Sequence, residues 1–284
     1  MMLLKRIQRR LIQCAAFGFC NLHAKNLLTG KLYTGKWKSF CVPGLNCYSC
    51  PAAAFSCPIG AMQAVSGSLR FNFSFYVMGL LLAFGIVLGR AVCGFLCPFG
   101  FLQELLHKSP SPKFHLPKFA KYIKYVILLV FVLILPVADK NFASVGDPAF
   151  CKYICPAGTL EGGIPLLLSH GELRAVVARL FTFKVAVLCL VLVGSVLVSR
   201  FFCKVLCPLG AIYALLNKVS LLSLRVDKSR CILCGACESV CPMDVNPVRS
   251  PRSAECIRCG VCARKCPAKA IEIKFTIEYN RTNV

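Results

Sequence analysis

The chain has 284 residues, of which 57% are hydrophobic and only 16% are charged, with a formal net charge of +23 and 21 cysteines. Soluble domains average about 45–50% apolar and about 25% charged residues, so this composition argues against a soluble enzyme and against disorder. Long apolar runs argue against a small disulfide scaffold, and basic residues flank those runs instead of forming the stripe of a nucleic-acid binder. The composition indicates a small membrane protein with an unusual number of thiols.

Three segments are apolar enough to cross a bilayer, which takes about 20 residues. They run from about Phe71 to Leu88, from Tyr122 to Val137 and from Leu180 to Val198, and a weaker fourth candidate runs from Leu11 to Leu28. We therefore expect an α-helical membrane domain with about four transmembrane helices over residues 1–224.

Cysteine motifs surround two of these spans in the same order. A Cys-Pro-x-Gly motif, a span and then a C-x3-C-P-x-G motif occur twice, which predicts an internal duplication that brings equivalent thiols together. The candidate cofactor-binding residues of this domain are Cys47, Cys50, Cys57, Cys93, Cys97, Cys151, Cys155, Cys203 and Cys207.

The duplication predicts one thiol group at each end of the helices. The inner group is Cys93, Cys97, Cys203 and Cys207. The outer group is Cys151 and Cys155 with two of Cys47, Cys50 and Cys57. Each group is expected to hold a further iron–sulfur centre. A redox-active dithiol, a copper(I) site suited to soft thiolates and, at the outer end, a structural disulfide are the alternatives.

Two cysteine runs follow in the last 60 residues. Residues 231–241 read CILCGACESVC and residues 256–266 read CIRCGVCARKC, each followed by proline. Both match C-x2-C-x2-C-x3-C-P, the pattern of bacterial two-cluster ferredoxins. A zinc site does not require the third cysteine or the proline of each run. Disulfides are typical of secreted chains, and this chain does not have the composition of one. The runs predict two 4Fe-4S clusters in an α+β ferredoxin domain over residues 225–284.

The fourth cysteine of each run is expected to serve the cluster of the other run. One cluster should therefore be bound by Cys231, Cys234, Cys237 and Cys266. The other should be bound by Cys256, Cys259, Cys262 and Cys241. Ile232 and Ile257 are expected to shield the clusters, and Ala270–Ile277 to form a closing strand.

At these motifs the chain resembles the membrane polyferredoxins typified by NapH, the quinol dehydrogenase component of periplasmic nitrate reduction. NosR and the copper-reducing protein CcoG share parts of the pattern. The resemblance covers about residues 70–270, and the C-x3-C-P pairs of the family map onto Cys93/Cys97 and Cys203/Cys207. It implies an electron carrier of the cytoplasmic membrane that is linked to the quinone pool or to a partner reductase. The additional outer cysteines depart from NapH and leave the partner open.

The expected function is electron transfer between a quinone pool or an outer-face partner and a cytoplasmic redox protein, within an oxidoreductase complex. A copper reductase or assembly factor and a redox-sensing regulator are the rival functions. The chain is expected to cross the cell membrane several times, with both termini and the ferredoxin domain in the cytoplasm and residues 41–70 and 139–179 outside. Membrane lipid, a redox protein and a quinone are the expected partners, and nucleic acid is not. Glu104 and His107 lie one helix turn apart and are candidates for handling the protons of a quinol.

Overall fold

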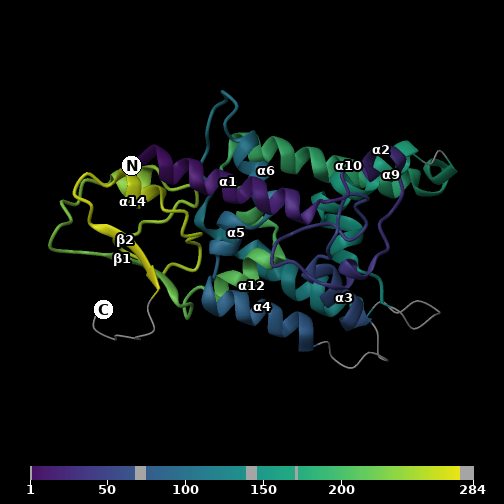
Figure 1. Cartoon of the computed structure of the whole chain (residues 1–284), viewed down its shortest axis with the longest axis horizontal. Helices are drawn as coiled ribbons and strands as arrows, with labels where there is room; N and C mark the ends of the chain where they lie inside the picture. Colours follow the sequence, from purple (N-terminus) through teal and green to yellow (C-terminus); the bar gives the residue numbers. More distant parts are fainter. Residues whose placement is uncertain (1, 68–74, 139–145, 170–171, 276–284) are drawn as a thin grey trace.

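The computed structural model describes residues 2–67, 75–138, 146–169 and 172–275. A helical part occupies most of the long axis, and a small module with two strands lies at one end (Figure 1). The helix α1 (Met2–Cys20) begins beside that module and extends toward the far end. The start of the described chain and its last strand therefore lie at the same end of the molecule.

The other helices of the helical part are α2 (Asn26–Thr29), α3 (Pro58–Gly67), α4 (Phe75–Val87), α5 (Ala91–Phe95), α6 (Pro98–Leu106), α7 (Ile123–Ile127), α8 (Leu135–Ala138), α9 (Ile164–Ser169), α10 (Glu172–Leu197), α11 (Phe201–Val205) and α12 (Pro208–Leu216). Two 3-10 helices are present, η1 (Lys36–Ser39) and η2 (Lys118–Tyr122). Three π-helical segments complete this part, η3 (Leu128–Ile134), η4 (Phe150–Ile154) and η5 (Gly158–Gly163).

The end module has a two-stranded antiparallel sheet. Strand β1 (Leu222–Val226) pairs with β2 (Ile271–Phe275), with Leu222 opposite Phe275, and the two short helices α13 (Ala236–Ser239) and α14 (Val261–Lys265) lie between them in the chain. The closing strand is thus confirmed over 271–275, and residues 276 and 277 lie outside the described residues. Because β1 extends across the expected boundary after residue 224, the module begins three residues earlier, at the start of β1.

Two helical stretches are long and apolar enough to cross a membrane by length and composition, Phe119–Ala138 and Arg179–Leu197. Only 28% and 17% of the residues in their apolar windows are buried, so they do not resemble core helices of a soluble protein. Helix α4 is apolar but has 13 residues, and residues 71–74 of the expected first span lie outside the described residues. The structure thus supports two of the expected spans, and α1 does not meet the same criteria.

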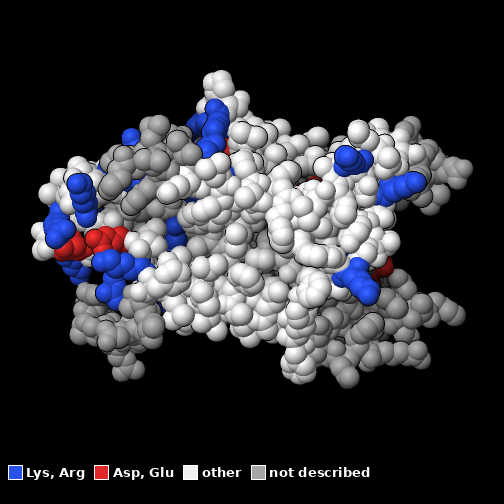
Figure 2. Space-filling model, in the orientation of Figure 1, with Lys and Arg blue, Asp and Glu red and all other residues white. Residues whose placement is uncertain are grey.

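Charged side chains gather at the two ends of the long axis, and a band of uncharged surface lies between them (Figure 2). Large apolar side chains are exposed along the helices of the middle part, including Leu82 of α4, Leu129 of η3 and Leu190 of α10. Large exposed apolar side chains on three elements of this part suit an apolar surrounding.

One continuous hydrophobic core joins the helical part to the module. It contains Cys57 and Cys155 toward one end, Cys93 and Cys207 in the middle, and Cys259 of the module. A core of this kind fixes the relative positions of its members, because protein interiors are closely packed.

Candidate functional site

The four cysteines of the inner group converge in the structure. Helix α5 carries Cys93 and the turn after it carries Cys97, and α11 with its following turn carries Cys203 and Cys207 in the same way. Burial, and then the charges of the other three thiols, raise the pKa of the Cys207 thiol. The repeated motifs therefore bring four buried sulfurs within interaction distance, and what they bind stays a prediction.

Proline sets the direction of the thiol in each motif. A residue before proline avoids the helical conformation, and Cys207 is extended (φ −77°, ψ 111°) before α12 begins at Pro208. Proline suits the first helical position because its missing N–H would have no partner there. The Cys207 thiol is left free to accept a hydrogen bond from the N–H of Gly210 (3.3 Å).

The glycine of the motif leaves room for the C-x3-C turn before it and for an arginine side chain of the other repeat. A Cβ atom on Gly100 would lie 2.8 Å from the carbonyl oxygen of Cys93 and 3.2 Å from Nη1 of Arg200. A Cβ atom on Gly210 would similarly lie 3.3 Å from the carbonyl oxygen of Cys203. Glycine therefore permits the close approach that packs each C-x3-C turn against the helix that follows it.

Two fully buried arginines connect the repeats. Nη1 of Arg200 donates to the carbonyl oxygen of Cys93 (2.7 Å), and Nη2 of Arg90 donates to the carbonyl oxygen of Cys203 (3.1 Å). This reciprocal exchange is what a duplicated unit predicts. It also places two positive charges beside four thiols, where they would offset negative charge at the site.

The carboxylate of Glu104 is a fixed anion. It pairs with Arg9 and with Arg200. Burial alone would raise the pKa of Glu104, but the charges of Arg200 and Arg9 outweigh burial and lower the pKa to about 2. The expectation that Glu104 and His107 handle quinol protons is therefore wrong for Glu104, because two guanidinium groups hold its carboxylate ionised.

The outer group converges as well, and the structure selects its members. Burial, and then the charges of Cys151, Cys47 and Cys57, raise the pKa of the Cys155 thiol. Cys50 instead packs with Cys47 against two alanines of the same loop. The structure thus places Cys47 and Cys57 opposite Cys151 and Cys155.

A buried acid lies beside the outer group. Glu161 accepts a hydrogen bond from the backbone N–H of Cys47 (3.1 Å), and burial raises the pKa of its carboxyl to about 7. Glu161 is not part of any motif that the sequence singles out. The available signal was its position six residues after Cys155, which matches that of Tyr213 after Cys207.

One loop and one tyrosine link the inner and outer groups. The hydroxyl of the buried Tyr213 donates to the carbonyl oxygen of Pro43 (2.8 Å). Burial, and then the charges of nearby thiols, raise the pKa of this hydroxyl. Tyr213 packs in the core that contains Cys57 of the outer group and Cys97 of the inner group. A Cβ atom on Gly44 would lie 3.0 Å from the Cα of Cys97. Cys47 is three residues further along, a span of at most about 11 Å. The inner and outer groups therefore lie closer together than the sequence predicted, since it placed them at opposite ends of the helices.

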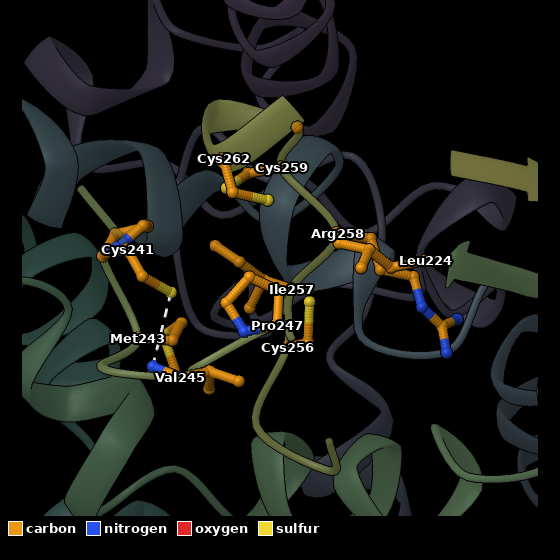
Figure 3. Close-up of a pocket in the computed structure, with 12 residues that line it drawn as sticks. Leu224, Cys241, Met243, Val245, Pro247, Cys256, Ile257, Arg258, Cys259 and Cys262 are labelled. Carbon is orange, nitrogen blue, oxygen red and sulfur yellow. Dashed lines mark hydrogen bonds between the residues drawn. The ribbon is translucent and has the colours of Figure 1, made fainter. Parts of the chain in front are cut away.

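The four cysteines expected at the second ferredoxin site lie together in the structure. Cys241 of the first run and Cys256, Cys259 and Cys262 of the second run line one cavity (Figure 3). Burial, and then the charges of the other three thiols, raise the pKa of Cys262 to about 12. The sulfur of Cys241 also accepts the N–H of Val245 (3.4 Å), the dashed line of Figure 3.

The first ferredoxin site lies closer to the surface. Burial, and then the charges of Cys231 and Cys234, raise the pKa of Cys237, and Cys266 packs against the small core that contains Cys237. Ile257 is 1% exposed and covers the second site, but Ile232 is 66% exposed. The shielding of a cluster by Ile232 therefore stays a prediction, whereas the second run, which carries Ile257, packs against Gly94 of α5.

The donor sets fit iron–sulfur clusters, which are held by four cysteine thiolates. All 21 cysteines are free thiols. Among the described residues, no three His, Cys, Asp or Glu side chains gather closely enough to hold a single metal ion.

A cavity of about 290 Å³ borders the outer group. Its lining includes Cys57, Lys38, Tyr48 and Tyr76. The buried ammonium group of Lys38 lies 5.1 Å from the centre of the Tyr48 ring. The cavity gives a small molecule a route toward one thiol of the outer group.

A family model described as a 4Fe-4S binding domain matches residues 54–76, 71–117, 125–169 and 180–229. Each matched region contains one Cys-Pro-x-Gly motif, and together they cover more than half of the chain. The chain belongs to this 4Fe-4S binding domain family. A second model of the same description matches residues 224–245, which include the first ferredoxin run.

The curated relatives that this chain resembles include an uncharacterized protein, a putative electron transport protein and a ferredoxin-type protein. The chain is 28% identical over 169 residues to the uncharacterized protein MJ0749 of Methanocaldococcus jannaschii, covering 60% of this chain and 57% of that protein. It is 26% identical over 185 residues to the putative electron transport protein YccM of Escherichia coli, covering 58% and 45%. It is 24% identical over 177 residues to the ferredoxin-type protein NapH of Haemophilus influenzae, covering 61% and 54%.

The chain thus spans about half the length of the curated relatives it matches. No solved structure matches it. The resemblance to the NapH-type family is confirmed by these relatives and by the matched 4Fe-4S binding domains.

Proposed function

We propose that this protein is a membrane-bound electron-transfer subunit that holds four iron–sulfur clusters in series. The observation that supports the proposal most is the order of four sets of four cysteines along one packed molecule. In order, the sets are Cys231, Cys234, Cys237 and Cys266; Cys241, Cys256, Cys259 and Cys262; Cys93, Cys97, Cys203 and Cys207; and Cys47, Cys57, Cys151 and Cys155. When bound, each cluster would supply a one-electron carrier.

Buried residues link each neighbouring pair of sets. The two ferredoxin sets meet in one small core, which contains Cys237 and Cys262. Asn217 accepts the N–H of Arg90 (3.0 Å) and donates to the carbonyl oxygen of Cys256 (3.0 Å), which ties the second ferredoxin set to the inner group. Tyr213 packs in the core that contains Cys97 of the inner group and Cys57 of the outer group. The side chains between successive sets are buried, so the chain excludes water from the route.

The proposed orientation places the long axis across a bilayer. The band of uncharged surface between charged ends, and the two long apolar helices with outward-facing side chains, support it. The ferredoxin module would lie in the cytoplasm, where clusters of this kind are assembled, and the outer group would lie nearer the far side. A redox protein would then approach the exposed Cys234 of the first set, and a quinone or another small donor or acceptor would approach Cys57 through the outer cavity.

Reporter fusions test the orientation. Fusions at both termini should report the cytoplasmic side. Insertions at residue 45 or 160 are unsuitable, because both positions lie next to the outer group. A C-terminal reporter that is active only outside the cytoplasm would reverse the proposed orientation.

Iron and sulfide quantification after anaerobic purification tests the cluster number. We expect about sixteen iron atoms per chain, four for each cluster. A Cys93→Ala, Cys203→Ala double variant should lose about four of them. A control that replaces the exposed Cys14 and Cys189 by alanine should lose none. About eight irons, unchanged by the first double variant, would contradict the proposal, and bound copper(I) in place of the additional iron would favour a metal reductase.

A further inference from the structure

Two buried glutamines occupy the same position at the inner and outer groups. Gln63 on α3 follows Cys57 by six residues, and Gln103 on α6 follows Cys97 by six residues. Their exposed fractions are 0% and 1%. A buried side-chain amide is costly unless its polar atoms find partners, so these partners reveal what the position does.

Gln103 makes three contacts at the inner group. Its Oε1 accepts the backbone N–H of Phe202 (3.0 Å), the residue before Cys203. Its Nε2 donates to the carbonyl oxygen of Phe99 (3.4 Å) and to the sulfur of Cys203 (3.1 Å).

Gln63 repeats all three contacts at the outer group. Its Oε1 accepts the N–H of Phe150 (2.9 Å), the residue before Cys151, and its Nε2 donates to the carbonyl oxygen of Ile59 (3.3 Å) and to the sulfur of Cys151 (3.1 Å). Gln63 and Cys151 are 88 residues apart in the sequence, and Gln103 and Cys203 are 100 residues apart.

The backbone fixes which end of each amide faces sulfur. A backbone N–H can donate only to the amide oxygen, so the neighbouring phenylalanine N–H holds Oε1 and turns Nε2 toward the thiol. The contact is therefore a directed N–H donor on the first cysteine of a C-x3-C-P motif. Gln13 provides the contrast, because it is as buried but donates to the carbonyl oxygen of Gly94 and to Glu104 and contacts no sulfur.

We propose that Gln63 and Gln103 raise the reduction potentials of the clusters at the outer and inner groups, each acting on its own site. The inference rests on the proposed function, which places clusters at these thiols. Hydrogen bonds to ligand sulfurs are among the factors that set cluster potentials. Reduction adds negative charge at a site, and a fixed N–H donor interacts more favourably with the more negative state. The glutamines are thus positioning residues that bias the two centres toward the reduced form.

Redox titration monitored by electron paramagnetic resonance tests the proposal in the anaerobically purified full chain. Replacing Gln103 by leucine should lower the potential of one centre, with about a tenfold smaller ratio of reduced to oxidised centre at a fixed potential, or about 59 mV. Replacing Gln63 by leucine should lower the potential of a different centre. The Cys93→Ala, Cys203→Ala variant assigns the signals, because it removes the inner one.

Three further variants keep the test sharp. Gln103→Glu and Gln63→Glu keep an acceptor for the phenylalanine N–H but remove the amide donor, so they should also lower the potential, even where a leucine variant loses its cluster. Gln13→Leu should change no potential. Unchanged potentials in glutamate variants with full iron content would overturn the inference and leave the proposed function intact. About eight irons in the unaltered protein would overturn both.

Discussion

The Cys-Pro-x-Gly motif shows how two residues that bind nothing can build a site. Proline removes the cysteine from the helix, and glycine admits the carbonyl group of the C-x3-C turn that precedes it. The local sequence therefore determines the direction of each thiol before any tertiary contact forms. The four glycines of the motifs are not equivalent, however, and a Cβ atom on Gly60 would meet nothing within 4 Å.

Replacing Gly100 by alanine should destabilise the inner group. The new Cβ atom would lie 2.8 Å from the backbone oxygen of Cys93, which cannot move as a flexible side chain would. We expect a loss of about 1–3 kcal/mol, the usual cost of overpacking. Thermal unfolding and iron content measure it. The matched control is Gly60→Ala, which should keep all its iron and gain up to about 1 kcal/mol from helix propensity; equal losses in both variants would show that the close approach does not matter.

Replacing Glu104 by glutamine should leave the buried Arg200 without its carboxylate. We expect a loss of about 3–5 kcal/mol at neutral pH, the usual cost of breaking a buried pair. Because the pKa of Glu104 falls from 4.5 to about 2 on folding, its stabilising effect is present above pH 4.5 and is lost as the pH falls toward 2. The stability difference between the two proteins should therefore shrink over that window in apoprotein unfolding measurements. A difference that is independent of pH would contradict this account.

At the scale of elements, spacing and hydropathy predicted the ferredoxin module, two long apolar helices and the convergence of four inner thiols. These features follow from local patterns, such as the C-x2-C-x2-C-x3-C-P runs. The loop 41–47 was not predicted, because it has no periodicity and its role depends on contacts with Tyr213 and Cys97. For the same reason the sequence could not choose Cys57 over Cys50, and it did not reveal that Glu104 is held between two arginines.

Replacing Tyr213 by phenylalanine should loosen the loop between the inner and outer groups. The change leaves the carbonyl oxygen of Pro43 without its hydroxyl donor in a buried place, which costs about 1–3 kcal/mol. Hydrogen exchange over residues 41–47 should become faster, and thermal stability should fall. Tyr122→Phe is the control, since Tyr122 is exposed. No change in exchange at the loop would show that the hydroxyl does not hold it.

At the scale of the whole molecule, buried charges fasten the ferredoxin module to the helices. Glu255 of the module pairs with both Arg90 and Lys124, whose side chains are fully buried. Lys204 of α11 pairs with Asp244 of the module (2.5 Å). These pairs fix the position of the second ferredoxin set relative to the inner group, on which any transfer between them depends.

Replacing Glu255 by glutamine should separate the two parts more readily. It leaves two buried cations uncompensated, for which we expect a loss of about 3–5 kcal/mol. Limited proteolysis between the helical part and the module should become faster, and unfolding should show two transitions. Glu272→Gln is the control, because Glu272 pairs with Lys274 on the exposed surface of β2. A single unshifted transition in Glu255→Gln would contradict the role of this carboxylate.

The separation of each thiol group into an early half and a late half of the chain also constrains biosynthesis. The outer set needs Cys47 and Cys57 from early in the chain and Cys151 and Cys155 from its middle, and the inner set is complete only when Cys207 has left the ribosome. Until then the early cysteines form only half of each site, because the cysteines of the later motif have not yet been synthesised. Because the completed sites are buried, the proposed clusters would have to be delivered before the late motif packs onto α5 and α6. The order of translation would then favour filling the outer set first and the inner set second.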